Sequence, residues 1–175
     1  MNFPRRSVNT AVTVIGVDHL IQFPPNGNAT TPPEAWYEPD LRKVVSVLGP
    51  VLICEEAGYS KPESIAHSVA DSLGHSYCNV DMPREERRRR GISEDYANFP
   101  ECMSNHSCEN IRAWHAEREK FMFDEILRAY SIAAQEQPPR LVVICGARHL
   151  DPLARLLAQH FLSATITRLD WTGYK

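Results

Sequence analysis

The stretch VVICGARHL, Val142–Leu150, decides the predicted fold class. Four apolar residues run into Gly146, and His149 follows three positions later. An unbroken apolar run of this length is typical of a strand that is covered on both faces of a parallel sheet. Asp151-Pro152 comes next, and this pair is typical of a helix N-cap followed by the first helical position. The stretch therefore predicts a buried strand, a turn that carries a titratable ring, and a helix.

The rest of the chain predicts the same alternation of strands and helices. Apolar runs predict strands at Ala11–Ile15, Val51–Cys54, His75–Val80, Leu141–Cys145 and, at a sheet edge, Ala164–Leu169. Capping residues and helical spacing predict helices at Asp40–Leu48, Ser60–Leu73, Asn110–Gln135 and from Asp151 onward. This alternation predicts an α/β fold: a mostly parallel central sheet flanked by helices, a three-layer sandwich. The 175 residues fit a single domain, 1–175, with long loops at 21–33 and 91–109.

Composition excludes several classes of function. The net charge is −3 at pH 7, which provides neither a nucleic-acid footprint nor a membrane-binding surface. No apolar run is long enough to span a bilayer, and the N-terminus does not match a signal peptide. The five cysteines are an odd set, which favours free thiols in a reducing cytosol over a disulfide framework. We therefore expect a cytoplasmic protein without nucleic-acid or membrane partners, and leave a homodimer open.

The turn after Gly146 has a counterpart near the N-terminus. In VIGVDHL, Val14–Leu20, a strand again runs into a glycine, Gly16, and a histidine, His19, follows three positions later. The carboxyl ends of strands form the edge of an open α/β sheet where ligands bind. Each glycine permits a sharp turn or the close approach of a ligand, so we expect both positions to border the substrate. The alternative is a pair of capping or core histidines that make local hydrogen bonds.

Two carboxylates follow a third predicted strand. Glu55 and Glu56 come directly after Val51–Cys54 and so belong to the same sheet edge. Two histidines and one carboxylate form a set that suits a divalent cation with an open position for water. We expect His19, Glu55 and His149 to be the metal ligands, although the sequence does not decide which glutamate points inward. The alternative is that one or both glutamates face solvent at the strand end.

Arg118 is the polar residue that stands out on the predicted helix Asn110–Gln135. It falls on the apolar stripe formed by Ile111, Trp114, Met122, Ala129 and Ala133. A guanidinium stays charged, and burying it without an anion costs several kcal/mol. Arg118 therefore requires either a core carboxylate, as in a structural salt bridge, or an anionic substrate. Glu125 lies on the same stripe and is a second candidate, as ligand or as partner.

These motifs together resemble a known superfamily. EREKFMFDEI, Glu117–Ile126, is similar to the Glu-Arg-Asp-x-x-Met stretch of TraB-type proteins. The paired Gly-x-x-His motifs, the strand-end glutamate and Arg118 resemble the superfamily that joins TraB, the TIKI proteases, the haem-binding ChaN lipoproteins and the erythromycin esterases. Asp81 is similar to a strand-end aspartate of the TraB group and is a candidate for substrate binding. The motifs occur in the family's order across about residues 12–170.

The resemblance implies an α/β fold with a site built from His19, Glu55 or Glu56, Arg118 and His149. In TIKI-like members such a site hydrolyses peptides with a metal, so the expected activity is hydrolysis of a peptide or ester bond, with manganese or zinc as cofactor. The chain departs from the erythromycin esterases, which have a glutamate where Val17 stands, and it is shorter than usual TraB-type chains. The alternative function is a non-catalytic module that binds a small anion, a nucleotide or haem.

Two further patterns carry weaker predictions. Cys102, His106 and Cys108 match no standard zinc spacing, so we interpret ECMSNHSCE as a polar loop. The run Arg87–Arg90 follows acidic residues and has no interleaved aromatics, so we interpret it as a solvated face.

Overall fold

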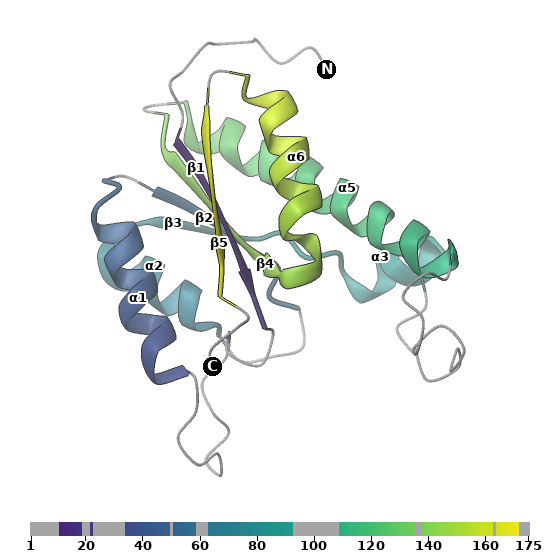
Figure 1. Ribbon diagram of the computed structural model, residues 1–175, viewed down its shortest axis with the longest axis horizontal. Helices are drawn as coiled ribbons and strands as arrows, with labels where there is room; N and C mark the ends of the chain where they lie inside the picture. Colours follow the sequence, from purple (N-terminus) through teal and green to yellow (C-terminus); the bar gives the residue numbers. More distant parts are fainter. Residues whose placement is uncertain are drawn as a thin grey trace.

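Five parallel strands form the centre of the molecule in the computed structural model, which describes residues 11–18, 22, 34–49, 51–58, 63–92, 109–135, 138–162 and 164–171. The strands are β1 Ala11–Val17, β2 Val51–Glu55, β3 Ser76–Asn79, β4 Arg140–Gly146 and β5 Thr165–Asp170. They are arranged in the order β3-β2-β4-β1-β5 (Figure 1). The predicted α/β class with a parallel central sheet is confirmed, and β5 is the predicted edge strand.

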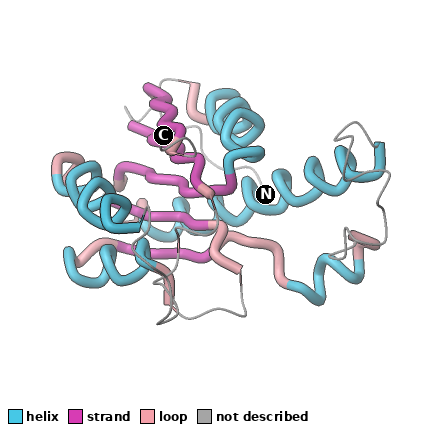
Figure 2. Tube along the Cα trace, turned by 60° about the horizontal axis from the view of Figure 1, so that its bottom comes forward, coloured by secondary structure: helices cyan, strands magenta, loops and turns pink. Residues whose placement is uncertain are grey.

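Helices cover both faces of the sheet and complete three layers (Figures 1 and 2). On one face α1 (Glu34–Ser46) and α2 (Ile65–Leu73) pack against alternate strand residues. On the other face α5 (Glu109–Ala133) and α6 (Leu150–His160) pack against the intervening ones. Because successive strand side chains point to opposite faces, one apolar strand supplies both cores. The central strands β2 and β4 are buried along nearly their whole length, as their unbroken apolar runs predict.

Several element boundaries differ from those predicted. α1 begins at Glu34, not at Asp40, and contains Pro39 in its second turn, where the helix forgoes one backbone hydrogen bond. α2 begins after Ser64, not after Ser60, because the Ser64 hydroxyl accepts from His67 N at 3.1 Å and caps the helix.

The turn before α6 also differs. A short 3₁₀ turn, Ala147–His149, precedes the helix, which begins at Leu150. Asp151 therefore lies in the first turn, where it complements the helix dipole, and is not the N-cap. The charged segment before Gly91 forms a short helix, α3 (Arg84–Arg89). Cys54, Cys78 and Cys145 are free thiols.

The connections between strands define where a ligand site is expected. The chain leaves β2 toward α2 on one face and leaves the neighbouring strand β4 toward α6 on the opposite face. Neighbouring strands whose connections diverge in this way form a topological switch point, and ligands of open α/β sheets bind at its carboxyl end. Within the described part of the chain, no helix is sufficiently long and apolar to cross a membrane.

Candidate active site

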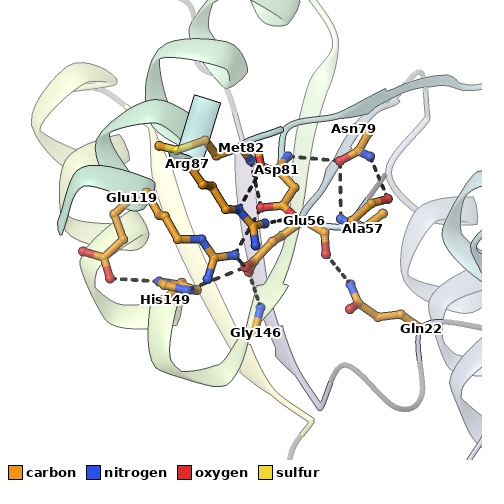
Figure 3. A network of polar contacts seen from close by, with 12 residues as sticks. Gln22, Glu56, Ala57, Asn79, Asp81, Met82, Arg87, Glu119, Gly146 and His149 are labelled. Atoms are coloured by element: carbon orange, nitrogen blue, oxygen red, sulfur yellow. Dashed lines mark hydrogen bonds and ion pairs between the residues drawn. The ribbon is translucent and has the colours of Figure 1, made fainter. Parts of the chain in front are cut away.

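Glu56 bridges the carboxyl ends of β2 and β4 at this switch point. It continues the alternation of Leu52 and Cys54, and therefore points to the face that α5 and α6 cover. Its backbone N donates to Ile144 O at 2.9 Å, and its Oε2 accepts from Gly146 N at 2.9 Å (Figure 3). The side chain is 1 % exposed, so this carboxylate is fixed at the strand ends and shielded from water.

The guanidinium groups of Arg87 and Arg118 and the carboxylates of Glu56 and Asp81 form a charged cluster. Arg118 on α5 donates through Nη2 to Glu56 Oε1 and to Asp81 Oδ1, the latter at 3.1 Å. Arg87 on α3 donates through Nη2 to Asp81 Oδ2 at 2.5 Å and through Nε to Met82 O at 2.8 Å. Arg118 thus has the core carboxylates that its place on the apolar stripe requires. Each buried charge lies against an opposite charge, which offsets its desolvation cost.

Asn79 fixes the loops that carry the two carboxylates. Its Oδ1 accepts from Asp81 N at 3.0 Å and from Ala57 N at 3.4 Å, and so joins the chain after β2 to the chain after β3 (Figure 3). Asp81 Oδ1 also accepts from Met82 N at 2.8 Å. Glu56 and Asp81 are therefore held by backbone donors as well as by the arginines, and their positions do not depend on the charges alone.

His149 enters the cluster from the opposite side, at the end of the 3₁₀ turn after β4. Its side chain is 3 % exposed, and its Nε2 lies 3.6 Å from Glu56 Oε1. Its Nδ1 lies 2.9 Å from Oε1 of Glu119 on α5 (Figure 3). A carboxylate oxygen accepts hydrogen bonds, so we assign Nδ1–H as the donor in this contact and Glu119 Oε1 as the acceptor. Nε2 is then the ring atom that faces Glu56 and is able to take up a proton.

A second imidazole, His115, packs against His149. The ring centroids are 5.1 Å apart and the planes are inclined by 65°. Burial, followed by the neighbouring His149 and Arg118, lowers the pKa of His115 to about 4. The ring is therefore neutral at neutral pH. Among the described residues neither ring nitrogen has a hydrogen-bond partner, although both are shielded from solvent.

Glu55, the glutamate favoured as a metal ligand by sequence, lies on the opposite face of the sheet. Gln22 Nε2 donates to its Oε1 at 3.1 Å, and Tyr77 OH and Ser64 Oγ donate to its Oε2, Tyr77 at 2.8 Å. Burial raises the pKa of Glu55, against the lowering effect of these hydrogen bonds. Strand alternation separates Glu55 from His149, so Glu56 is the carboxylate that lies beside the histidine.

Gly16 allows α6 to start close to the sheet. A Cβ at this position would lie 3.1 Å from Leu150 Cδ2 and 3.4 Å from Ala147 Cα. The glycine therefore serves the packing of the turn that carries His149, and its predicted place at the border of the substrate stays a prediction. His19, the other predicted ligand and catalytic residue, lies outside the described residues.

The described residues do not assemble the predicted metal-ligand set. Glu56 and His149 remain as neighbours, but both Glu56 oxygens accept hydrogen bonds, one of them from the Arg118 guanidinium. A cation in contact with a carboxylate repels a second cation, so the contact with Arg118 disfavours a divalent metal at Glu56. The predicted metal stays a prediction, since His19 lies outside the described residues. Within the described ranges, one group of three or more His, Cys, Asp or Glu side chains has ligand atoms within 4.8 Å of one another. It consists of Glu63, which precedes α2, and of His67 and Asp71 on α2.

Sequence reasoning missed Glu119, His115 and Arg87. His115 and Glu119 are four residues apart on α5, a spacing that puts both on one side of the helix beside Arg118. That spacing is the sequence signal for this pair. The apolar stripe instead pointed to Glu125, which pairs with Arg128 at 2.6 Å. Arg87 belongs to the run interpreted as a solvated face. It turns inward, whereas Arg89 and Arg90 pair with Glu86.

Cys145, which directly precedes Gly146, is the potential nucleophile nearest to His149 in the sequence. Burial, followed by the charges of Glu56 and Glu119, raises the pKa of its thiol well above the usual value. The thiol therefore stays protonated and is a weak nucleophile. This leaves the imidazole of His149 as the group suited to proton transfer.

Comparison with protein-family models, with curated proteins and with solved structures gives no match to this chain. The fold and the cluster define the class on their own. The chain is an α/β protein with a buried carboxylate–imidazole–guanidinium cluster at the carboxyl edge of a parallel sheet.

Proposed function

We propose that the protein hydrolyses an ester or peptide bond, and that His149, oriented by Glu119, is the general base. The observation that carries the proposal is the position of the His149 ring. Its Nδ1 is held by Glu119 at 2.9 Å, and its Nε2 faces the cluster at the switch point, 3.6 Å from Glu56. A carboxylate that holds one imidazole nitrogen while the other accepts a proton is the arrangement used in acyl-transfer catalysis.

The reaction proceeds by attack of water on the substrate carbonyl carbon. His149 Nε2 takes the proton of the attacking water, and a carbon–oxygen bond forms. Glu119 and Glu56 flank the resulting imidazolium and stabilise its charge. The bond to the leaving alkoxide or amine then breaks, and Nε2 returns the proton to that leaving group. Electrons and protons balance without a metal, which agrees with the poor fit of Glu56 to a cation.

Arg118 acts as a positioning residue in this proposal. Its guanidinium lies against Glu56 and Asp81, so two carboxylates already offset its charge. This pairing favours hydrolysis of an uncharged bond over the alternative, the capture of a small anion by Arg118. The cluster thus holds the Arg118 guanidinium against two carboxylates, and this cation is not offered to the ligand.

The test is hydrolysis of p-nitrophenyl acetate and of a fluorogenic peptide library by the wild type, His149→Asn and His75→Asn. The last variant is the matched control, since His75 precedes β3, away from the cluster. We expect His149→Asn to lower kcat/KM about 10²–10⁴-fold, the range that general-base catalysis supplies, and His75→Asn to leave it unchanged. Equal rates in all three proteins would show that hydrolysis, if present, does not use this site.

A further inference from the structure

His115 lies on the same side of α5 as the polar residues of the cluster. It precedes Arg118 by three residues and Glu119 by four, the spacings that bring helical side chains together. Its ring meets the His149 ring at 5.1 Å between centroids, inclined by 65°. The helix therefore presents His115, Arg118 and Glu119 to the turn that holds His149.

The two nitrogens of His115 are an exception to how polar atoms are buried. Both are shielded from solvent, and neither has a hydrogen-bond partner among the described residues. Native proteins pair the large majority of buried polar atoms, because an unpaired one loses its hydration without compensation. An apolar ring would fill the same volume without this penalty. A histidine kept at such a position calls for a partner that the described residues do not supply.

The charges around His115 indicate what kind of group would pair with its ring nitrogens. Arg118 lies against Glu56 and Asp81, Arg87 against Asp81, and His149 against Glu119. His115 is neutral, since its pKa is lowered to about 4, and a neutral imidazole offers one N–H donor and one acceptor nitrogen. Unlike an arginine, it has no net charge with which to attract a phosphate or a carboxylate.

We propose that His115 is a catalytic residue that donates a hydrogen bond to the carbonyl oxygen of the substrate, and that the substrate group at this site is an uncharged ester or amide. This inference rests on the proposed hydrolysis. The N–H of His115 binds the carbonyl oxygen in the ground state and holds the negative charge that develops on it when water attacks. A donor fixed by packing before the reaction stabilises that charge without further reorganisation. In this proposal His149 is the general base, and His115 is the hydrogen-bond donor to the carbonyl oxygen.

The decisive variant is His115→Phe, which keeps a planar ring and removes both nitrogens. We expect its melting temperature to rise, because the unpaired polar atoms are gone, while its kcat/KM for p-nitrophenyl acetate falls about 100-fold, the loss typical of one oxyanion donor. The loss is expected mainly in kcat. His75→Phe is the control and should change neither quantity. A variant that is more stable and hydrolyses the ester at the wild-type rate would make His115 a packing residue and overturn the proposal.

The claim about substrate charge has its own readout. Wild-type protein is assayed with p-nitrophenyl acetate and with p-nitrophenyl phosphate, which share a leaving group and differ in charge. Turnover of the acetate alone supports an uncharged substrate group. Turnover of the phosphate that is lost in His115→Phe would contradict it.

A binding measurement separates this inference from the proposed function. N-methylacetamide is titrated into wild-type protein labelled with ¹⁵N-histidine, with His115→Phe used to assign the signal. A change in the His115 ring shifts that saturates supports carbonyl recognition, even if the protein hydrolyses no substrate and the proposed activity fails. Hydrolysis without any His115 shift would leave the activity standing and overturn the role of His115.

Discussion

Glu119 Oε1 lies 2.9 Å from His149 Nδ1, so a carboxylate on the 25-residue helix α5 determines which nitrogen of a strand-end imidazole carries the proton. The two residues are 30 positions apart in sequence. Their contact joins α5 to the turn after β4, and directs Nε2 toward Glu56. In the proposed mechanism, the role of His149 as general base depends on this one hydrogen bond.

The tautomer of His149 is the first testable consequence. We expect ¹⁵N spectra of histidine-labelled protein to show His149 protonated at Nδ1, because Glu119 accepts only. In Glu119→Leu, which removes the acceptor, His149 should shift toward a mixture of tautomers. Glu117→Leu, an exposed neighbour on α5, serves as the control and should leave the signal unchanged. An Nε2–H tautomer in the wild type would contradict the assigned hydrogen bond.

The charged cluster should contribute strongly to stability. Arg118→Met removes the guanidinium and leaves Glu56 and Asp81 buried without it, which should lower the free energy of unfolding by about 3–5 kcal/mol. Arg128→Met is the matched control, since Arg128 on the same helix forms an exposed pair with Glu125, and should cost at most about 1 kcal/mol. Urea denaturation measures both values. A loss of similar size in the two variants would show that the buried arginine has no special role.

His115 should make the protein less stable in acid. Its folded pKa of about 4 lies below the ordinary value of 6.5, so the unfolded chain binds the proton first as the pH falls. Stability is therefore lost between about pH 6.5 and pH 4, and His115→Phe should lose this part of the pH dependence. Thermal unfolding of both proteins across that range measures the difference. Parallel stability curves would contradict the depressed pKa.

Glu55 should have the opposite effect on the pH dependence and make the protein less stable as the pH rises. Burial raises its folded pKa above the ordinary value of 4.5, so the unfolded chain loses the proton first as the pH rises. The contribution of Glu55 to stability therefore falls as the pH increases above 4.5. Glu55→Gln, which stays uncharged, should remove this slope, whereas Glu63→Gln on the surface should not. The comparison is made by urea denaturation at several pH values.

The fold was predictable because its signals are local. The apolar runs around Ile53 and Ile144 are those of strands covered on both faces, and they identify a parallel sheet without further information. Boundaries were less predictable where a local signal misled: Asp151 has the chemistry of an N-cap, but the 3₁₀ turn places it inside the helix. Ser64, and not the predicted Ser60, caps α2. The Ser64 hydroxyl also donates a hydrogen bond to Glu55.

The candidate site was only partly predictable because it depends on which helix covers which face. Arg118, Asp81 and His149 each had a signal in the sequence, namely a charge on an apolar stripe and two polar residues at strand ends. The choice between Glu55 and Glu56 required knowing that α5 lies on the side of Cys54. Glu119 and His115 gained their significance only from contact with His149, a long-range relationship that no local pattern contains.

The measurement that tests the account most directly is the pH–rate profile of p-nitrophenyl acetate hydrolysis by the wild type and by Glu119→Gln. The glutamine amide is able to donate a hydrogen bond to Nδ1 and so to stabilise the tautomer whose Nε2 is already protonated. We predict a kcat that is lower by up to about 10⁴-fold at neutral pH. An active wild type whose rate and pH profile are unchanged by Glu119→Gln would contradict the claim that Glu119 and His149 form the catalytic pair.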